Sequence, residues 1–107
     1  VVASDIIEVN KSIYVSPEMV KKIRYQICDY TAIENMQISP NDIRSIAEQD
    51  NRAAEVNPTM LISVAANKDL SFGLSRVWEA YTNEVPFRTE VFRTVEDCRE
   101  WIRSQLT

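Results

Sequence analysis

The side chains that could carry out chemistry are few in this sequence. Of its 107 residues none is histidine, two are cysteine and one is glycine. Histidine is the commonest general base, so its absence removes Ser-His and Cys-His pairs. Two cysteines alone cannot close a tetrahedral zinc shell, and one glycine cannot build a phosphate-cradling loop. These counts predict a protein with no enzyme active site, no metal site and no cofactor.

Cys28, beside Asp29, is the remaining candidate nucleophile. No base accompanies it, and a cysteine in the middle of a strand is usually a small core hydrophobe. The carboxylates of Glu96, Asp97 and Glu100 could hold a hard cation, but they follow one another on the solvated face of a predicted helix, without loop geometry. The residue types therefore favour binding over catalysis.

Composition narrows the kind of partner. The net charge is −4, the isoelectric point is near 4.8, and the cations are scattered between carboxylates. Nucleic-acid binding needs a basic face, so no nucleic-acid partner is predicted. No apolar run approaches the ~20 residues of a transmembrane segment. With two cysteines, which suit a reducing compartment, this predicts a cytoplasmic location and at most peripheral contact with a membrane.

The hydrophobic pattern predicts one α/β domain over residues 1–107. Tight Asn-Gly hairpins are missing, which favours parallel strands joined by helical crossovers. The predicted helix caps are Ser4, Ser16, Ser39, Asp69 and Thr94. The predicted strands are residues 24–31, 59–66 and 88–93, and the predicted helices are 5–14, 17–23, 40–56, 70–84 and a last one from 95.

Three strands make a thin sheet for so many helices. We therefore expect one or two further strands before Val1, or that Val1 and Val2 end one of them.

Several short motifs resemble one bacterial family. They are residues 24–30 (RYQICDY), residues 39–44 (SPNDIR), residues 69–81 (DLSFGLSRVWEAY) and the stretch from Val91 to Ile102. Together they resemble the STAS-like family of stage II sporulation protein AA-like proteins. The resemblance covers roughly Asp5 to Leu106 and implies a STAS-like parallel or mixed sheet with helices packed on it.

The resemblance implies two functions. The broader group is likened to lipid-binding CRAL–TRIO domains, which implies a small apolar or lipid-like ligand, at a membrane surface in some cases. Sporulation-type STAS proteins instead bind regulatory proteins and are switched by phosphorylation of a serine in an Asp-Ser-Ser-Gly turn. The matching turn here is Gln37-Ile38-Ser39-Pro40, which lacks the acid and the glycine, so Ser39 is expected to act as a helix cap. The alternative function is a regulatory protein-interaction module that docks through the helix from Ser39 to Val56.

Gly73 is the main clue to a ligand site. A glycine inside a helix costs roughly 1 kcal/mol against alanine, so either close packing or close approach of a ligand should offset it. Among the nearby aromatic residues Phe72, Trp78 and Tyr81, Phe72 is off the apolar stripe and is expected to be the most exposed. A pocket between this helix and the sheet is predicted. Its expected ligand-binding residues are Tyr30, Phe72, Gly73, Arg76 and Trp78.

A second location is the carboxyl edge of the strands, where open parallel sheets bind ligands. The polar residues expected there are Asp29, Thr31, Asn67, Lys68, Asp69, Ser71 and Thr94. Capping is the simpler role for Asp69 and Thr94.

Overall fold

Three parallel strands form the central sheet of the molecule. The structure is a computed structural model, and it describes residues 2–82 and 88–106. They are β1 (Tyr25–Asp29), β2 (Leu61–Ala65) and β3 (Arg88–Phe92). Their order is β1-β2-β3, and Leu61 is in register with Tyr25 on one side and Arg88 on the other. The α/β class and the parallel sheet are confirmed, and β3 is an edge strand of the described sheet, as its polar sequence predicts.

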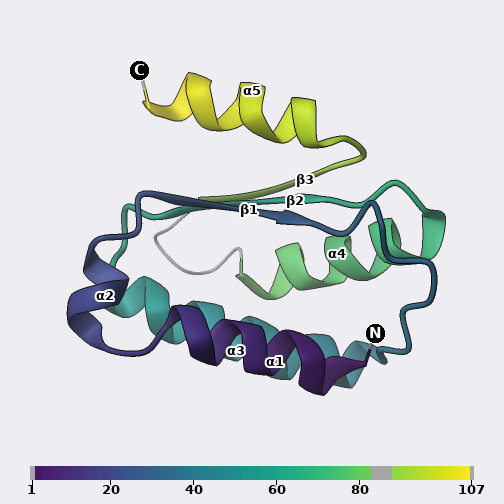
Figure 1. Cartoon of the computed structure of the whole chain (residues 1–107), viewed down its shortest axis with the longest axis horizontal. Helices are drawn as coiled ribbons and strands as arrows, with labels where there is room; N and C mark the ends of the chain where they lie inside the picture. Colours follow the sequence, from purple (N-terminus) through teal and green to yellow (C-terminus); the bar gives the residue numbers. More distant parts are fainter. Residues whose placement is uncertain (1, 83–87, 107) are drawn as a thin grey trace.

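Helices cover the two faces of this sheet unequally. The helices are α1 (Ala3–Ile13), α2 (Pro17–Lys21), α3 (Pro40–Val56), α4 (Asp69–Thr82) and α5 (Val95–Leu106). Helices α1 to α4 lie on one face and α5 alone lies on the other (Figure 1). Consecutive crossovers in the same direction place α3 and α4 on the same face, because such connections are right-handed. Among the described residues no helix is long and apolar enough to cross a membrane.

Three of the helix starts follow the predicted capping. The Ser39 hydroxyl accepts a hydrogen bond from the Asp42 amide at 3.2 Å, and the Asp42 carboxylate accepts one from the Ser39 amide at 3.0 Å. Ser16 caps α2 through the Met19 amide, and Thr94 caps α5 through the Asp97 amide. These side chains satisfy amide groups that have no partner within the helix.

Two predicted caps are wrong. Helix α1 already includes Ser4, and its start is held by Asp5, whose carboxylate accepts a hydrogen bond from the Val2 amide at 2.9 Å. Asp69 is the first residue of α4, and its carboxylate pairs with Arg93 at 3.0 Å. The predicted end of this helix, at Glu84 before Pro86, lies outside the described residues.

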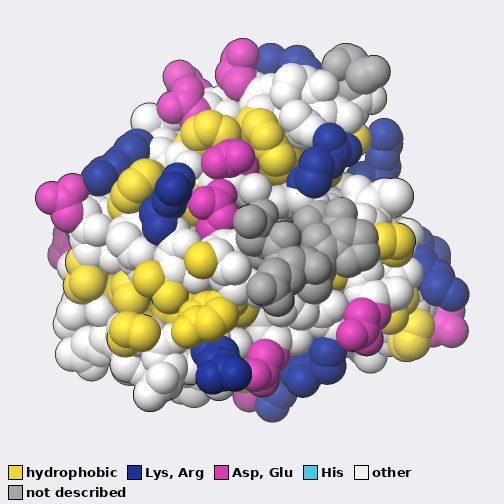
Figure 2. Space-filling view, turned by 180° about the vertical axis from the view of Figure 1, so that it is seen from behind, with side chains coloured by type: hydrophobic (Ala, Val, Ile, Leu, Met, Phe, Trp, Pro, Cys, Tyr) yellow, Lys and Arg dark blue, Asp and Glu magenta, His cyan; other side chains and the backbone are white. Residues whose placement is uncertain are grey.

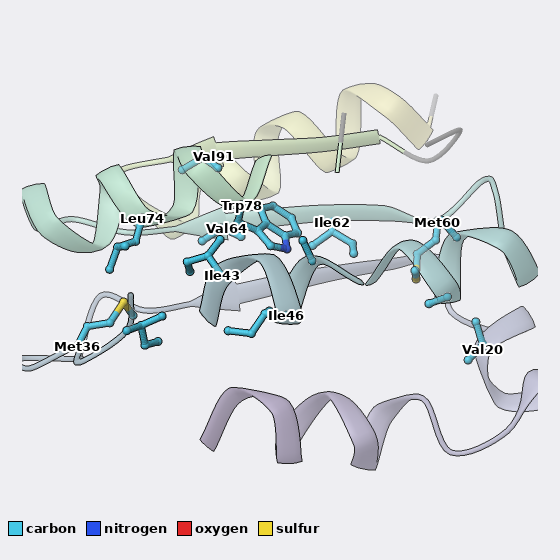
Figure 3. Packing of buried hydrophobic residues seen from close by; sticks show 14 residues of the cluster. Val20, Met36, Ile43, Ile46, Met60, Ile62, Val64, Leu74, Trp78 and Val91 are labelled. Carbon is cyan, nitrogen blue, oxygen red and sulfur yellow. The ribbon is translucent and has the colours of Figure 1, made fainter. Parts of the chain in front are cut away.

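The hydrophobic core lies between the sheet and helices α3 and α4. All five residues of β2 are buried, as its continuous apolar sequence predicts. Ile62 and Val64 from this strand meet Ile43 of α3 and Trp78 of α4 (Figure 3). Because the strand alternates, Leu61 and Ala65 face α5 instead.

Candidate functional site

An apolar groove lies between α1 and the edge strand β1. Its volume is about 550 Å³. The α1 wall is formed by Asp5, Ile6, Val9, Asn10 and Ile13, and the opposite wall by Gln26, Ile27, Cys28, Asp29, Tyr30 and Ile33. Most of this lining is hydrocarbon, and the two carboxylates, Asp5 and Asp29, are exposed. A groove of this size is within the usual range for small-molecule sites, roughly 300–1,000 Å³.

A small cavity of about 30 Å³ lies behind the groove, inside the core. The residues that line both hollows are Ile6, Asn10, Gln26, Cys28 and Tyr30. The far wall of the cavity includes Ile43, Ile62 and Trp78, and also the buried carboxyl group of Asp50. The groove and the cavity are therefore separated by a single layer of side chains.

Asp50 is the centre of a hydrogen-bond network that joins four parts of the chain. One of its oxygens accepts from the Tyr14 hydroxyl at 2.7 Å and the other from the Trp78 indole nitrogen at 2.8 Å. The Tyr14 hydroxyl in turn accepts from the Gln26 side-chain amide at 2.8 Å. The network links α3 to α4, to β1 and to the connection after α1. A buried carboxyl group is costly unless it is hydrogen-bonded, and here both oxygens have donors.

Burial raises the pKa of Asp50 to about 6, and the hydrogen bonds from Tyr14 and Trp78 oppose that rise. Burial also raises the pKa of Tyr14, with a further contribution from the charge of Asp50. Asp50 is thus a core carboxyl group that exchanges its proton near neutral pH.

The other titratable groups of the shared wall are held in their neutral forms. Burial raises the pKa of the Cys28 thiol to about 12, and the charge of Asp50 adds to this effect. Burial likewise raises the pKa of Tyr30. A protonated thiol is a poor nucleophile, so the geometry favours Cys28 as a wall of the hollow rather than a reacting group. In residues 2–82 and 88–106, no set of three or more Cys, Asp or Glu side chains is placed to hold a metal ion.

Helix α1 is positioned over the sheet edge by polar contacts with α3. The side-chain amide of Asn10 donates to the Gln49 side-chain oxygen at 3.1 Å, and the Gln49 amide donates to the Ile7 carbonyl at 3.3 Å. Asn10 is buried. These contacts hold the α1 wall of the groove at a set distance from β1.

Only part of the predicted ligand-binding set comes together. Tyr30 and Trp78 line the same inner cavity. Phe72, Gly73 and Arg76 line neither this cavity nor the groove. Phe72 packs against the edge of the core with the Arg93 guanidinium 4.0 Å above its ring, and Arg76 pairs with Glu79 at 3.5 Å. The described hollow lies on the α1 side of β1, away from the outer side of α4.

The expectations for Gly73 and Phe72 need correction. A Cβ placed on Gly73 would meet no heavy atom of the described residues within 4 Å, so close packing, one of the two alternatives that the sequence left open, is not found there. Tyr81 is exposed at 42%, whereas Phe72 is partly buried, so Phe72 is not the most exposed of the three aromatic residues. The reason is local: the side of α4 that carries Phe72 faces Arg93, at the end of β3.

The polar residues at the carboxyl edge of the sheet are engaged with one another. Asp29 accepts from both the amide and the hydroxyl of Thr31, which lowers the pKa of this carboxyl group. The Lys68 amino group donates to the Ile33 carbonyl at 2.7 Å. Together with the Arg93–Asp69 pair these contacts tie the connections to one another, which is a structural role.

Sequence reasoning missed the polar residues of the site: Tyr14, Gln26, Gln49 and Asp50. For Asp50 a signal was present. It falls on the same helical face as Ile43, Ile46, Ala47 and Ala54, and a carboxylate on such a face must find partners. The identity of those partners, Tyr14 and Trp78, depends on the tertiary fold.

Comparisons of this chain with models of protein families, with curated proteins and with solved structures find no match. The interpretation of the site therefore rests on its geometry.

Proposed function

We propose that this chain is a non-enzymatic binding module that takes a small, elongated apolar or lipid-like ligand in the groove between α1 and β1. The observation that carries the proposal is the arrangement of two hollows in series: an open apolar groove of about 550 Å³ backed by a cavity of about 30 Å³. The apolar body of a ligand would lie along Ile6, Val9 and Ile27, where its burial is favourable at roughly 25 cal/mol per Å².

The polar atoms of the shared wall give the ligand an orientation. Asn10, Gln26 and Tyr30 are polar residues on the inner side of an otherwise apolar groove. Hydrogen bonds from the amide groups of Asn10 and Gln26 to Gln49 and Tyr14 hold two of these side chains in place. A few polar groups in an apolar lining are typical of small-molecule sites. The resemblance to STAS-like proteins, which are likened to lipid-binding domains, agrees with this class of ligand.

The alternative, a regulatory module that docks through α3, has weaker support. The exposed residues of α3 are polar or charged except for Pro40 at its first position: Asn41, Arg44, Ser45, Glu48, Arg52 and Glu55. Such a face is an ordinary solvated helix surface, whereas the groove offers apolar area to a ligand.

Binding can be tested with N-phenyl-1-naphthylamine, a neutral apolar dye whose fluorescence rises on transfer from water. Val9 is 57% exposed and lines the groove, so Val9→Lys should place a cation at its rim without disturbing the core. We expect this variant to bind the dye about tenfold more weakly than the wild type. Met19→Lys is the matched control, because Met19 is similarly exposed at 51% but does not line the groove. A wild type that does not bind the dye, or equal losses in the two variants, would refute the proposal.

A further inference from the structure

The outer side of α4 carries an apolar stripe that the described part of the chain covers only in part: Val77 is partly buried against the core, and the rest of the stripe is open. Leu70 is 62% exposed and Tyr81 is 42% exposed, and the spacing from Leu70 through Gly73 and Val77 to Tyr81 keeps these residues on one side of the helix. The view from behind shows a band of hydrophobic side chains where α4 lies (Figure 2). An exposed apolar stripe on a helix is typical of a surface that packs against a partner.

Gly73 lies in the middle of this stripe. An alanine would be the better helix former there, and nothing within 4 Å in the described residues would oppose its methyl group. The chain therefore leaves bare backbone facing outwards between the exposed Leu70 and the partly buried Val77. Bare backbone allows a second helix to come closer than a side chain would permit.

The stripe is complementary to itself. Leu70 is three residues before Gly73 and Val77 is four after it, while Asp69 is four before and Arg76 is three after. If two such helices cross antiparallel at Gly73, Leu70 of one copy lies against Val77 of the other. Asp69 then lies against Arg76 of the other copy. A two-fold axis repeats both contacts, so each charge meets its opposite twice.

The two charged side chains are available for this pairing. The Asp69 side chain is 98% exposed and that of Arg76 is 57% exposed. Their contacts within the chain, to Arg93 and Glu79, are surface ion pairs, which contribute little and can be shared. A different protein would need to supply this pattern of opposite charges, whereas a second copy supplies it by symmetry.

From these observations we propose that two copies of this chain form a two-fold symmetric dimer through α4, with the helices crossing antiparallel at Gly73. The helix has 14 residues and is about 21 Å long, so the interface is small. We therefore expect a weak, concentration-dependent dimer, near the lower end of specific protein–protein interfaces.

Sedimentation equilibrium over a concentration range that reaches the millimolar tests the dimer. Gly73→Ala should weaken dimerisation about tenfold or more, because a methyl group enters the closest contact. The same variant should melt at a higher temperature when the chain is dilute, because alanine favours the helix. Met19→Ala, which removes an exposed apolar side chain from α2, should leave dimerisation unchanged.

Charge reversal gives an independent test that does not depend on Gly73. Asp69→Arg and Arg76→Asp should each weaken dimerisation, since like charges then face each other, and the double variant should restore it. A wild type that stays monomeric at the highest concentration would overturn the proposal. So would a Gly73→Ala variant that dimerises as well as the wild type, or a double reversal that does not recover. Dye binding in the α1–β1 groove is a separate property, so these results are independent of the proposed ligand site.

Discussion

The two faces of the sheet bury their residues against different partners. On one face α5 alone covers the strands, and its residues Cys98 and Ile102 are buried. The centroids of the Trp101 and Phe92 rings are 6.4 Å apart. On the other face α3 and α4 enclose a core that includes the carboxyl group of Asp50 and a cavity. Both faces bury polar groups, since the Ser63 hydroxyl is buried on the α5 side, but among the described residues the buried carboxyl group lies on the second face.

This difference supports the proposed ligand site on the side of Asp50. A polar network in the core lowers stability unless each of its members is satisfied, and apolar side chains of similar size would be the simpler way to fill the same space. The α5 face comes closer to such an interior, because the buried polar side chain there is the small Ser63. The hydrogen bonds around Asp50, directly behind the open groove, are therefore the feature of the fold that packing alone does not explain.

The largest expected effect comes from truncating one buried isoleucine on each face. Ile62→Ala and Ile102→Ala should each lower the free energy of unfolding by about 2–5 kcal/mol, because each leaves a cavity. Urea unfolding measures this change. Ile62 lines the inner cavity, so its truncation enlarges that cavity and should raise the affinity for N-phenyl-1-naphthylamine.

Ile102 is a buried residue of α5, on the other face of the sheet from the groove, and its truncation should leave the affinity for the dye unchanged. If the two variants alter dye binding equally, the faces are not independent and the comparison between them fails.

The next effect is a pH dependence that belongs to the Asp50 face. The pKa of Asp50 is about 6 in the folded chain and about 3.9 in an unfolded one, so the folded state holds this proton more tightly. The resulting stabilisation is complete below about pH 4 and is lost as the pH rises through about 6. It amounts to about 3 kcal/mol.

Asp50→Asn removes this titration. The free energy of unfolding of the wild type should therefore fall relative to that of this variant as the pH rises from 4 to 7. The other carboxylates are common to both proteins, so their contributions cancel in this difference. With Trp101→Phe as background, the fluorescence of Trp78, which donates to Asp50, should change with a midpoint near pH 6. A difference that is flat with pH would show that Asp50 does not take up a proton in the folded chain.

Sequence reasoning predicted the elements better than the site. The caps at Ser39 and Thr94 and the apolar run of β2 are set by neighbours along the chain, and all are confirmed. The groove depends on where α1 lies over β1, which is decided by contacts such as that of Asn10 with Gln49, 39 residues away. A pattern within one helix cannot show such a contact.

Gly73 illustrates the same limit. Its place inside a helix indicated that something must offset its cost, and the sequence left packing and ligand contact as alternatives. The structure leaves the outer side of Gly73 open. No contact within the described part of a single chain therefore offsets the cost of a glycine in this helix. The residue was informative, but the feature that explains it, a helix surface available to another molecule, exists only in three dimensions.

Removal of a helix cap should give the smallest loss of stability, and the loss should be the same on both faces of the sheet. Ser39 caps α3 and Thr94 caps α5, each by accepting a hydrogen bond from the amide three residues later, at 3.2 and 3.1 Å. Ser39→Ala and Thr94→Ala should each lower the free energy of unfolding by about 1 kcal/mol. The two helices lie on opposite faces of the sheet, so the losses should add in the double variant.

Ser39→Asp separates this capping role from a regulatory one. Aspartate caps a helix as well as serine does and interacts favourably with the helix dipole, so this variant should keep the wild-type stability and the wild-type affinity for the dye. Urea unfolding and dye titration of the Ala and Asp variants measure both properties. If Ser39 instead acts as a switch for the groove, the negative charge should change the affinity while stability is unchanged. Equal affinity in the wild type and in both variants is the result expected of a cap, since α3 begins in the same way whichever side chain accepts the hydrogen bond.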